Sequence, residues 1–198
     1  MVRLEIAGLP TVPVGVSNRH IHLSQADLEI LFGPGYRLRP LRELSQPGEY
    51  AAEEVVTIVG PRGVIEGLRV LGPPREYTQV EVSLTDSYRL GLKPPVRESG
   101  DLEGTPGIAV VGPRGALTLP RGVILAARHI HMDPETAARC GLKDGQRVQV
   151  QVPGERGLVF GNVIIRIKPT YRLELHLDTD EANAALLKNG DVVQILLS

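Results

Sequence analysis

The stretch NRHIHL at residues 18–23 recurs as ARHIHM at residues 127–132, roughly half a chain later. These two words contain four of the five histidines in the 198-residue chain, and the fifth is His176. In an extended strand, residues two apart point to the same face, so both imidazoles of a pair can bind one ion. The isoleucine between them points the other way, toward a core. The repetition therefore predicts two strands that each present a metal-binding histidine pair.

The two halves align beyond the histidine words. Residues 56–63 resemble residues 150–157, and the stretch from Tyr77 resembles the stretch from Tyr171, which places Glu81 at the position of His176 within one residue. Strand alternation turns Glu81 away from its apolar neighbours. Each half thus offers three candidate ligands, which are His20, His22 and Glu81 in the first half and His129, His131 and His176 in the second. Three protein ligands leave a position open, as in catalytic zinc sites.

The rest of the chain predicts a mainly β protein. Its 22 glycines and 16 prolines separate short runs of Val, Ile and Leu, which predict strands at 54–59, 64–71, 78–84, 108–111, 147–152, 158–167, 173–177 and 192–197. Three short helices are predicted to begin at the N-caps Ser24, Asp133 and Asp178 and to end near Gly33, Gly141 and Asn189-Gly190. Each histidine site then ends a strand just before a capped helix. The repeat predicts two domains, at residues 1–106 and 107–198.

Composition narrows the class of function. The chain is 42% hydrophobic and 23% charged, with no apolar run long enough to cross a membrane and no signal peptide, which predicts a cytoplasmic protein. A net charge of −1, no Trp and two Phe argue against nucleic-acid binding. The lone Cys140 excludes an intrachain disulfide and a Cys-rich zinc motif, and we interpret it as a packing residue.

The two histidine words, together with ELHLDTDEANAA at residues 174–185, resemble the PduL-type phosphotransacylases, also called phosphate propanoyltransferases. The resemblance extends from about residue 13 to the C-terminus. It implies two tandem β-barrel domains capped by short helices, with a dinuclear zinc site between them. It also implies the reversible reaction of a short-chain acyl-CoA, propanoyl-CoA or acetyl-CoA, with phosphate to give acyl phosphate and CoA. A homodimer and an acyl kinase downstream in the pathway are implied as partners.

The resemblance also implies roles for individual residues. One zinc ion would be held by His20, His22 and Glu81, and the other by His129, His131 and His176, which agrees with the grouping from the repeat. Arg75 matches the phosphate-binding arginine of the family and is the candidate catalytic residue. The residues that match CoA contacts are Val16, Ser17, Asn18, Arg62, Arg69 and Asn183. The family often has Ala in place of Asn18.

These assignments predict direct attack of metal-bound phosphate on the thioester, with no acyl-enzyme, while the first zinc receives the CoA sulfur. Arg19 and Arg128 face away from the paired histidines by strand alternation, so we interpret them as structural or as peripheral CoA contacts. Family members in bacterial microcompartments carry an N-terminal targeting helix. Residues 6–10 form a poor helix, so a free cytosolic enzyme is expected rather than an encapsulated one.

Two other functions are compatible with a repeated His-x-His pair. Cupin-like metalloenzymes combine such a pair with a Glu a few residues later, whereas the nearest here is Glu29, seven residues past His22. A zinc-stabilised binding module would hold its ions in closed four-ligand sites, but six ligands are offered for two ions. A requirement for phosphate and CoA separates the transferase from the first alternative, and unfolding on metal removal would indicate the second.

Overall fold

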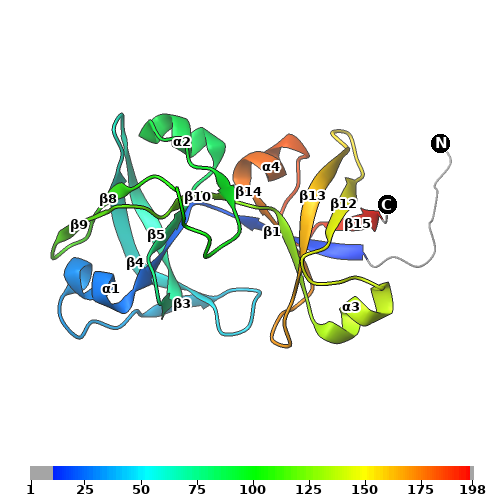
Figure 1. Ribbon diagram of the computed structural model, residues 1–198, viewed down its shortest axis with the longest axis horizontal. Coiled ribbons are helices and arrows are strands. Elements are labelled where there is room, and N and C mark those ends of the chain that lie inside the picture. The colour runs from blue at the N-terminus through cyan, green and yellow to red at the C-terminus, as the bar shows by residue number, and fades with distance from the viewer. Residues whose placement is uncertain (1–10, 197–198) are drawn as a thin grey trace. The chain divides into compact units, whose positions relative to one another are not determined.

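The computed structural model describes residues 11–196, so the N-terminal stretch at 6–10 and the last residue of the predicted strand 192–197 lie outside the described residues (Figure 1). Within that range the chain forms two compact units. The central unit comprises residues 18–127, and the terminal unit combines residues 11–17 with residues 128–196. Most elements are strands, and four short helices accompany them, which confirms the predicted mainly β class.

The central unit is a nine-stranded sheet with two helices. The pairing order is β7-β10-β6-β2-β5-β4-β8-β9, and β3 pairs with β4. Helices α1 (Gln25–Phe32) and α2 (Leu84–Leu90) begin at the serine N-caps Ser24 and Ser83. The strands are β2 (His20–Ser24), β3 (Pro40–Glu43), β4 (Tyr50–Val59), β5 (Val64–Arg75), β6 (Gln79–Glu81), β7 (Val96–Arg97), β8 (Ile108–Val111), β9 (Ala116–Leu119) and β10 (Val123–Ala126).

The terminal unit is a closed six-stranded barrel in the order β1-β14-β11-β13-β12-β15. Helices α3 (Pro134–Cys140) and α4 (Thr179–Ala184) begin at the aspartate N-caps Asp133 and Asp178. The strands are β1 (Thr11–Ser17), β11 (His129–Met132), β12 (Arg147–Val152), β13 (Leu158–Ile167), β14 (Glu174–Asp178) and β15 (Val192–Leu196). The predicted tandem of strand-rich units is therefore present, and the pairing closes into a barrel in the terminal unit.

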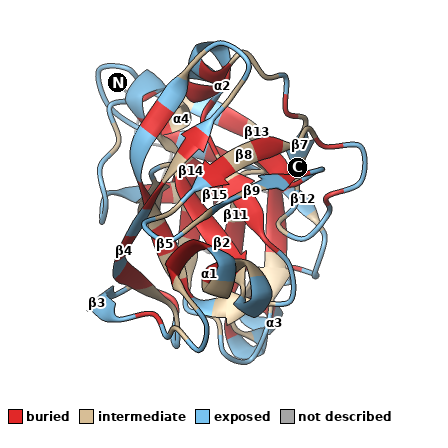
Figure 2. Cartoon of the chain, turned by 90° about the vertical axis from the view of Figure 1, so that its left-hand side faces the viewer, coloured by how far each residue is buried: buried red, intermediate tan, exposed pale blue. Residues whose placement is uncertain are grey.

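Each unit has its own hydrophobic core, built from the alternating residues of its strands. In β12 the sequence RVQVQV gives alternately exposed and buried side chains, as expected for a strand with one face on a core. Ile21 and Ile130, between the paired histidines, are fully buried, one in each core. Figure 2 shows buried residues concentrated on the strands. The predicted apolar back of both histidine strands is thus confirmed.

The units exchange strands that precede the histidine pairs. Strand β1 comes just before β2 in the chain, yet it pairs with β14 and β15 of the terminal unit, where Figure 1 shows it in blue. Strand β10 comes just before β11, yet it pairs with β6 and β7 of the central unit. The two exchanged strands occupy equivalent positions, since Gly15 of β1 lies opposite His176 and Ile124 of β10 lies opposite Glu81.

This exchange explains why the predicted division at residues 106 and 107 differs from the observed units. Strands β8 to β10 follow residue 106 but belong to the central sheet, and β1 belongs to the barrel. A boundary at one point in the chain assumes that strands adjacent in sequence pair in the same sheet. The strand sequences alone do not show which sheet a strand joins.

Helix starts are predicted well, but one helix is missed. The predicted helices from Ser24 and Asp133 match α1 and α3, whereas α4 ends at Ala184, before the predicted stop at Asn189-Gly190. The predicted strand 78–84 shortens to β6, because Ser83 and Asp86 form a capping box that opens α2. That Ser-x-x-Asp pattern, with Gly91 at the end of the helix, is visible in the sequence.

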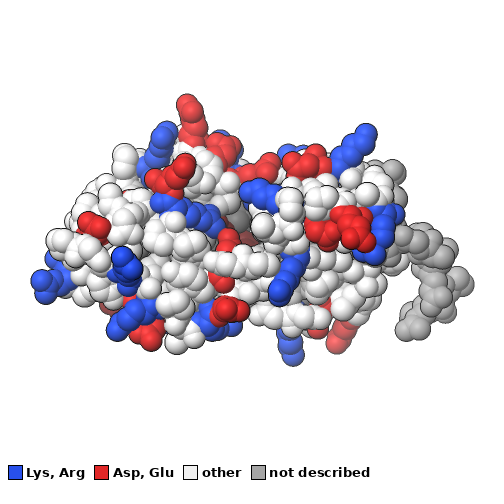
Figure 3. Space-filling view, turned by 90° about the horizontal axis from the view of Figure 1, so that it is seen from below, with Lys and Arg blue, Asp and Glu red and all other residues white. Residues whose placement is uncertain are grey.

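Among residues 11–196, no helix is both long and apolar enough to cross a membrane. Acidic and basic side chains are interspersed over the face seen in Figure 3. This distribution accords with the net charge of −1.

Candidate metal centres

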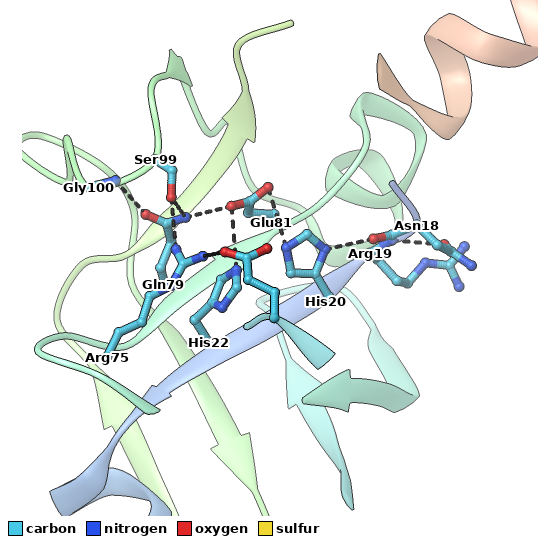
Figure 4. A network of polar contacts seen from close by, with 10 residues as sticks. Asn18, Arg19, His20, His22, Arg75, Gln79, Glu81, Ser99 and Gly100 are labelled. Carbon is cyan, nitrogen blue, oxygen red and sulfur yellow. Dashed lines mark hydrogen bonds and ion pairs between the residues drawn. The ribbon is translucent and has the colours of Figure 1, made fainter. Parts of the chain in front are cut away.

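The central triad consists of His20, His22 and Glu81. The two histidines leave the same face of β2, and Glu81 lies opposite His20 on the antiparallel strand β6. The Nε2 atom of His20 is 3.5 Å from Glu81 Oε2, and that of His22 is 4.0 Å from Oε1. Nδ1 of His20 donates to the Asn18 carbonyl at 2.8 Å, which fixes the ring with Nε2 toward Glu81 (Figure 4). The ligand atoms of the triad all lie within 4.8 Å of one another.

Burial and charge set the protonation of this triad. Burial lowers the pKa of His22 well below its usual value, with the charge of His20 adding to the effect. Burial alone would also lower the pKa of His20 and raise that of Glu81. The attraction and hydrogen bond between those two outweigh burial, so the pKa of His20 is raised and that of Glu81 is held far below its usual range. The metal-free triad therefore contains an ionised carboxylate beside a neutral His22.

A polar network holds the Glu81 carboxylate from its other side. Gln79 Nε2 donates to Glu81 Oε1 at 2.7 Å and to Ser99 Oγ at 2.9 Å, while Gln79 Oε1 accepts from the Gly100 N–H at 2.8 Å. Arg75 Nη1 donates to Ser99 Oγ at 3.0 Å, and Arg75 Nη2 lies 3.5 Å from Glu49 Oε1. Figure 4 shows Arg75 beside His22 and Gln79. The predicted phosphate-binding arginine is therefore linked to the triad through shared partners.

The terminal triad consists of His129, His131 and His176. The first two leave one face of β11, and His176 lies opposite His129 on β14, as Glu81 lies opposite His20. Ring centroids within the triad are 4.6 to 4.9 Å apart, and the His131 ring stacks on Tyr171 at 3.8 Å. Both ring nitrogens of His131 are buried, and neither has a hydrogen-bond partner among residues 11–196. Burial, followed by the charges of His129 and His176, lowers the pKa of His131 to about 2.

Both triads fit a divalent metal with nitrogen and oxygen ligands. A buried imidazole normally has a partner for its polar ring atoms, and His131 has none within the described part of the chain. Depressed pKa values keep His22 and His131 in the neutral form that binds metal. Imidazole with carboxylate is a common ligand set for zinc.

The residues that match CoA contacts are distributed over several elements. In the terminal unit, Val16 and Ser17 lie on β1, opposite the end of β14, and Asn183 lies on the adjoining helix α4. Asn18 begins the central unit, where its Oδ1 accepts from the N–H of Arg19.

Two arginines in the central unit complete this set. Arg62 lies in the turn between β4 and β5, against the end of α2. Arg69 lies opposite His20 on β5 and donates to the carbonyls of Ala52 and Glu53. Arg69 is thus held next to the central triad, whereas Arg62 lies at the start of the strand.

Three contributors to these centres were not predicted. Gln79, Ser99 and Tyr171 contact triad residues or Arg75. In the sequence, Gln79 precedes Glu81 by one strand period and Tyr171 begins the repeated stretch that contains His176, whereas Ser99 gives no signal. Ser99 reaches the network from a loop, and its position follows from tertiary structure alone. The predicted packing role of Cys140 agrees with its partly buried contact with the terminal core.

Arg19 and Arg128 have matching structural roles. Arg19 Nε lies 2.9 Å from Asp86 Oδ2, and Arg128 Nε lies 2.8 Å from Glu181 Oε1. Both carboxylates are the third helical residue of a capping box, in α2 and α4. The ion pairs therefore tie the helix that follows Glu81 or His176 to the residue just before each histidine pair, which agrees with the structural interpretation of both arginines.

Comparison with known proteins gives consistent matches. Residues 13–188 match the protein family described as phosphate propanoyltransferase. The phosphate propanoyltransferase of Thermotoga maritima is 60% identical over 94% of this chain and 90% of its own length. Those of Rhodopseudomonas palustris and Salmonella typhimurium are each 54% identical, over 93% and 88% of this chain and 81% and 83% of their own lengths.

Proposed function

Because this chain belongs to the phosphate propanoyltransferase family, we propose that it moves a short acyl group, propanoyl above all, between coenzyme A and inorganic phosphate. In the forward direction a phosphate oxygen forms a bond to the acyl carbon, and the carbon–sulfur bond of the thioester breaks. The products are propanoyl phosphate and the CoA thiolate, which takes up a proton from solvent. The product, a mixed anhydride, suits a kinase that passes its phosphoryl group to a nucleotide.

The observation that carries the proposal is the pair of buried triads in matching register. We infer that each triad holds one zinc ion, the central one through His20, His22 and Glu81 and the terminal one through His129, His131 and His176. Bound zinc would supply positive charge that polarises the thioester carbonyl and stabilises the departing thiolate. The protein contributes an ionised Glu81, the neutral imidazoles of His22 and His131, and the burial of both histidines.

Arg75 is the residue that we expect to bind phosphate. A guanidinium presents two parallel N–H donors that match two phosphate oxygens, and its Nη1 is already oriented by Ser99. Besides burial and His20, the Arg75 charge lowers the pKa of His22, so this guanidinium acts electrostatically on the central triad. We therefore propose that phosphate is oriented at Arg75, next to the central ion.

We propose direct transfer without an acyl-enzyme. Cys140 packs against the terminal core at the end of α3, and the reaction needs no thiol nucleophile. Ser99 Oγ accepts hydrogen bonds from two donors, Arg75 and Gln79, whereas an activated serine needs a neighbouring base. The phosphate oxygen is then the nucleophile itself.

We also propose the substrate range, oligomeric state, location and CoA contacts of the enzyme. Acetyl-CoA differs from propanoyl-CoA by one methylene, which an apolar pocket discriminates by only about 1 to 3 kcal/mol, so we expect both to react. We propose a homodimer and a free cytoplasmic enzyme. The proposed CoA contacts are Val16, Ser17, Asn18, Arg62, Arg69 and Asn183.

The decisive experiment measures release of free thiol from propanoyl-CoA and acetyl-CoA, with and without phosphate, by the full chain. The same assay is repeated after chelation and after return of zinc, and acyl phosphate is measured in parallel. We expect release that requires phosphate, produces acyl phosphate in equal amount, disappears on chelation and returns with zinc. Chelated protein should keep its circular dichroism spectrum, since each unit has a hydrophobic core.

Other results would contradict the proposal in distinct ways. Thiol release that is indifferent to phosphate would indicate a metal-dependent thioesterase. Full activity after chelation, with zinc shown to be absent, would remove the metal from the chemistry. Loss of all secondary structure on chelation would favour structural ions, as in a zinc-stabilised binding module.

A further inference from the structure

Glu174 lies beside the terminal triad but is not one of its three predicted ligands. It precedes His176 by two residues on β14 and therefore shares its face, opposite His131. Its Oε2 atom is 3.0 Å from His176 Nε2, and its side chain is only 13% exposed. A carboxylate is rarely buried to this extent, so its position next to an imidazole indicates a specific role.

The opposite strand leaves space for this carboxylate. Gly15 on β1 lies opposite His176, and a methyl group added to Gly15 would have its carbon 2.7 Å from Glu174 Cδ and 2.9 Å from Oε1. Any residue larger than glycine would displace the carboxylate. The corresponding position in the central unit, opposite Glu81, is the fully buried Ile124.

The central unit has a residue of matching position and opposite hydrogen-bonding character. Gln79 lies opposite His22, as Glu174 lies opposite His131, and its amide donates to the Glu81 carboxylate at 2.7 Å. In one unit a donor thus contacts a carboxylate ligand, and in the other an acceptor contacts an imidazole ligand. The residue two positions before the third ligand is complementary to that ligand in both units.

We propose that Glu174 is a positioning residue of the terminal metal centre, which holds His176 in place and provides a negative charge that the three imidazoles lack. A carboxylate at the ring nitrogen that is not bound to the metal orients a metal-binding histidine and strengthens its binding. Because Glu174 faces Nε2 of His176, this role requires that His176 bind the ion through Nδ1. Gly15 permits this arrangement by leaving the space that the carboxylate fills. The inference rests on the metal binding proposed above.

The test measures zinc affinity by competition with a chromophoric chelator, together with metal content of the dialysed protein. Glu174→Gln keeps the shape of the side chain and removes its charge. It is best examined with Glu81→Gln in the background, because that variant leaves the terminal centre as the remaining zinc site. We expect Glu174→Gln to weaken zinc binding at that centre by 10- to 100-fold, the range typical of such partners.

Two further measurements separate positioning from a general effect on folding. The visible absorption of bound Co²⁺ reports ligand geometry, and we expect its intensity or maximum to change in Glu174→Gln. Glu155→Gln removes the same charge from an exposed turn of the same unit and should change neither affinity nor spectrum. Thermal unfolding of the metal-free variants shows whether each one folds.

Gly15→Ala tests the same idea from the opposite strand. We expect it to weaken the terminal centre as Glu174→Gln does, and the double variant to be no weaker than either single variant, because both remove one contact. Glu174→Asp, which is shorter, should restore part of the affinity in the Gly15→Ala protein. If Glu174→Gln does not fold, Gly15→Ala and its rescue still decide the question.

The outcomes distinguish this inference from the proposed function. A wild-type chain that binds fewer than two zinc ions would overturn the metal centres and the inference together. A wild-type chain that binds two ions, with Glu174→Gln and Gly15→Ala both within twofold of the wild-type affinity, would overturn the role of Glu174 alone.

Discussion

The central and terminal triads share a backbone arrangement but differ in charge. In each, the first of two histidines on one strand lies opposite the third triad residue on an antiparallel strand, with a parallel strand on the other side. The central unit places its carboxylate in the triad, as Glu81, and an amide behind it. The terminal unit places an imidazole in the triad and a carboxylate, Glu174, beside it. The repeat thus sets the backbone positions of the triad residues and their neighbours. The residue type at each position determines the charge of each triad.

Removing the carboxylate of the central triad should have the largest effect. Glu81→Gln abolishes the only negative charge among the six triad residues while it preserves side-chain volume. We expect loss of the central ion, retention of the terminal ion and a fall in turnover of more than about 100-fold, since a direct ligand contributes more than its outer partners do. Metal content and phosphate-dependent thiol release measure both effects.

Glu66→Gln is the matched control for that experiment. Glu66 is exposed on β5 of the same unit, and its replacement should leave metal content and turnover unchanged. If the Glu81→Gln protein retained two ions and wild-type turnover, the Glu81 charge would not be needed for the central ion, and the proposed difference between the triads would be wrong.

The next largest effect should come from Arg75, the cation beside the central triad. Arg75→Lys keeps the charge but loses the two parallel donors, so binding of phosphate weakens by one charge-assisted hydrogen bond. Such a bond is worth about 1.5 to 3 kcal/mol, which corresponds to a rise of about 10- to 160-fold in the KM for phosphate. The KM for propanoyl-CoA and the zinc content should stay constant. Arg114→Lys, at an exposed position of the same unit, is the control, and equal changes in both KM values would contradict a specific role in phosphate binding.

The stability of the metal-free central unit should fall above neutrality, whereas that of the terminal unit should stay constant. In the central unit the attraction of Glu81 outweighs burial and raises the pKa of His20, so its contribution to stability is complete below the unfolded pKa of 6.5 and is lost as pH rises. In the terminal unit burial lowers the pKa of His131 to about 2, so its contribution is complete above 6.5 and is lost as pH falls. Each shift changes stability by up to about 1.4 kcal/mol per pH unit.

Amide hydrogen exchange of the metal-free protein, corrected for intrinsic rates, resolves the two units. Between pH 6 and 8 we expect protection of β2 and β6 to fall while that of β11 and β14 holds. Between pH 6.5 and 5, β11 should lose protection, and β2 should lose it too because His22 is also kept neutral by burial. Parallel behaviour of both units above pH 6.5 would contradict the charge difference between the triads.

The comparison also shows what the sequence could predict. Histidines two apart define one face of a strand whatever the fold, and Glu81 and His176 occupy matching positions in the aligned halves, each on an otherwise apolar strand. The triads therefore follow from local periodicity. Their partners do not, since Ser99 approaches Gln79 from a distant loop and Tyr171 stacks on His131 through the packing of the barrel.

The strand exchange was also beyond prediction from the sequence. The alternation of buried and exposed residues in β1 would fit either sheet. The two sheets differ in the side chain that the strand meets. Gly15 leaves space for the carboxylate of Glu174, whereas the corresponding residue of the central unit is the fully buried Ile124. That complementarity becomes visible once the register is known, which is why the predicted boundary after residue 106 differed from the observed one.

The smallest expected difference concerns the ion pairs that anchor α2 and α4. Arg19–Asp86 and Arg128–Glu181 occupy matching positions, and in both the arginine is about one-third exposed. Partly exposed pairs contribute about 1 kcal/mol or less, so double-mutant cycles with Arg→Met and the amide variants should give coupling energies near that value. The coupling should be somewhat larger for Asp86, whose side chain is 6% exposed against 18% for Glu181. Equal coupling energies of the two pairs in chemical denaturation would contradict the effect expected from the deeper burial of Asp86. A negligible coupling at Arg19 or Arg128 would instead mean that the arginine in question has been freed from its helix, and a test for contact with CoA would then be directed at that residue.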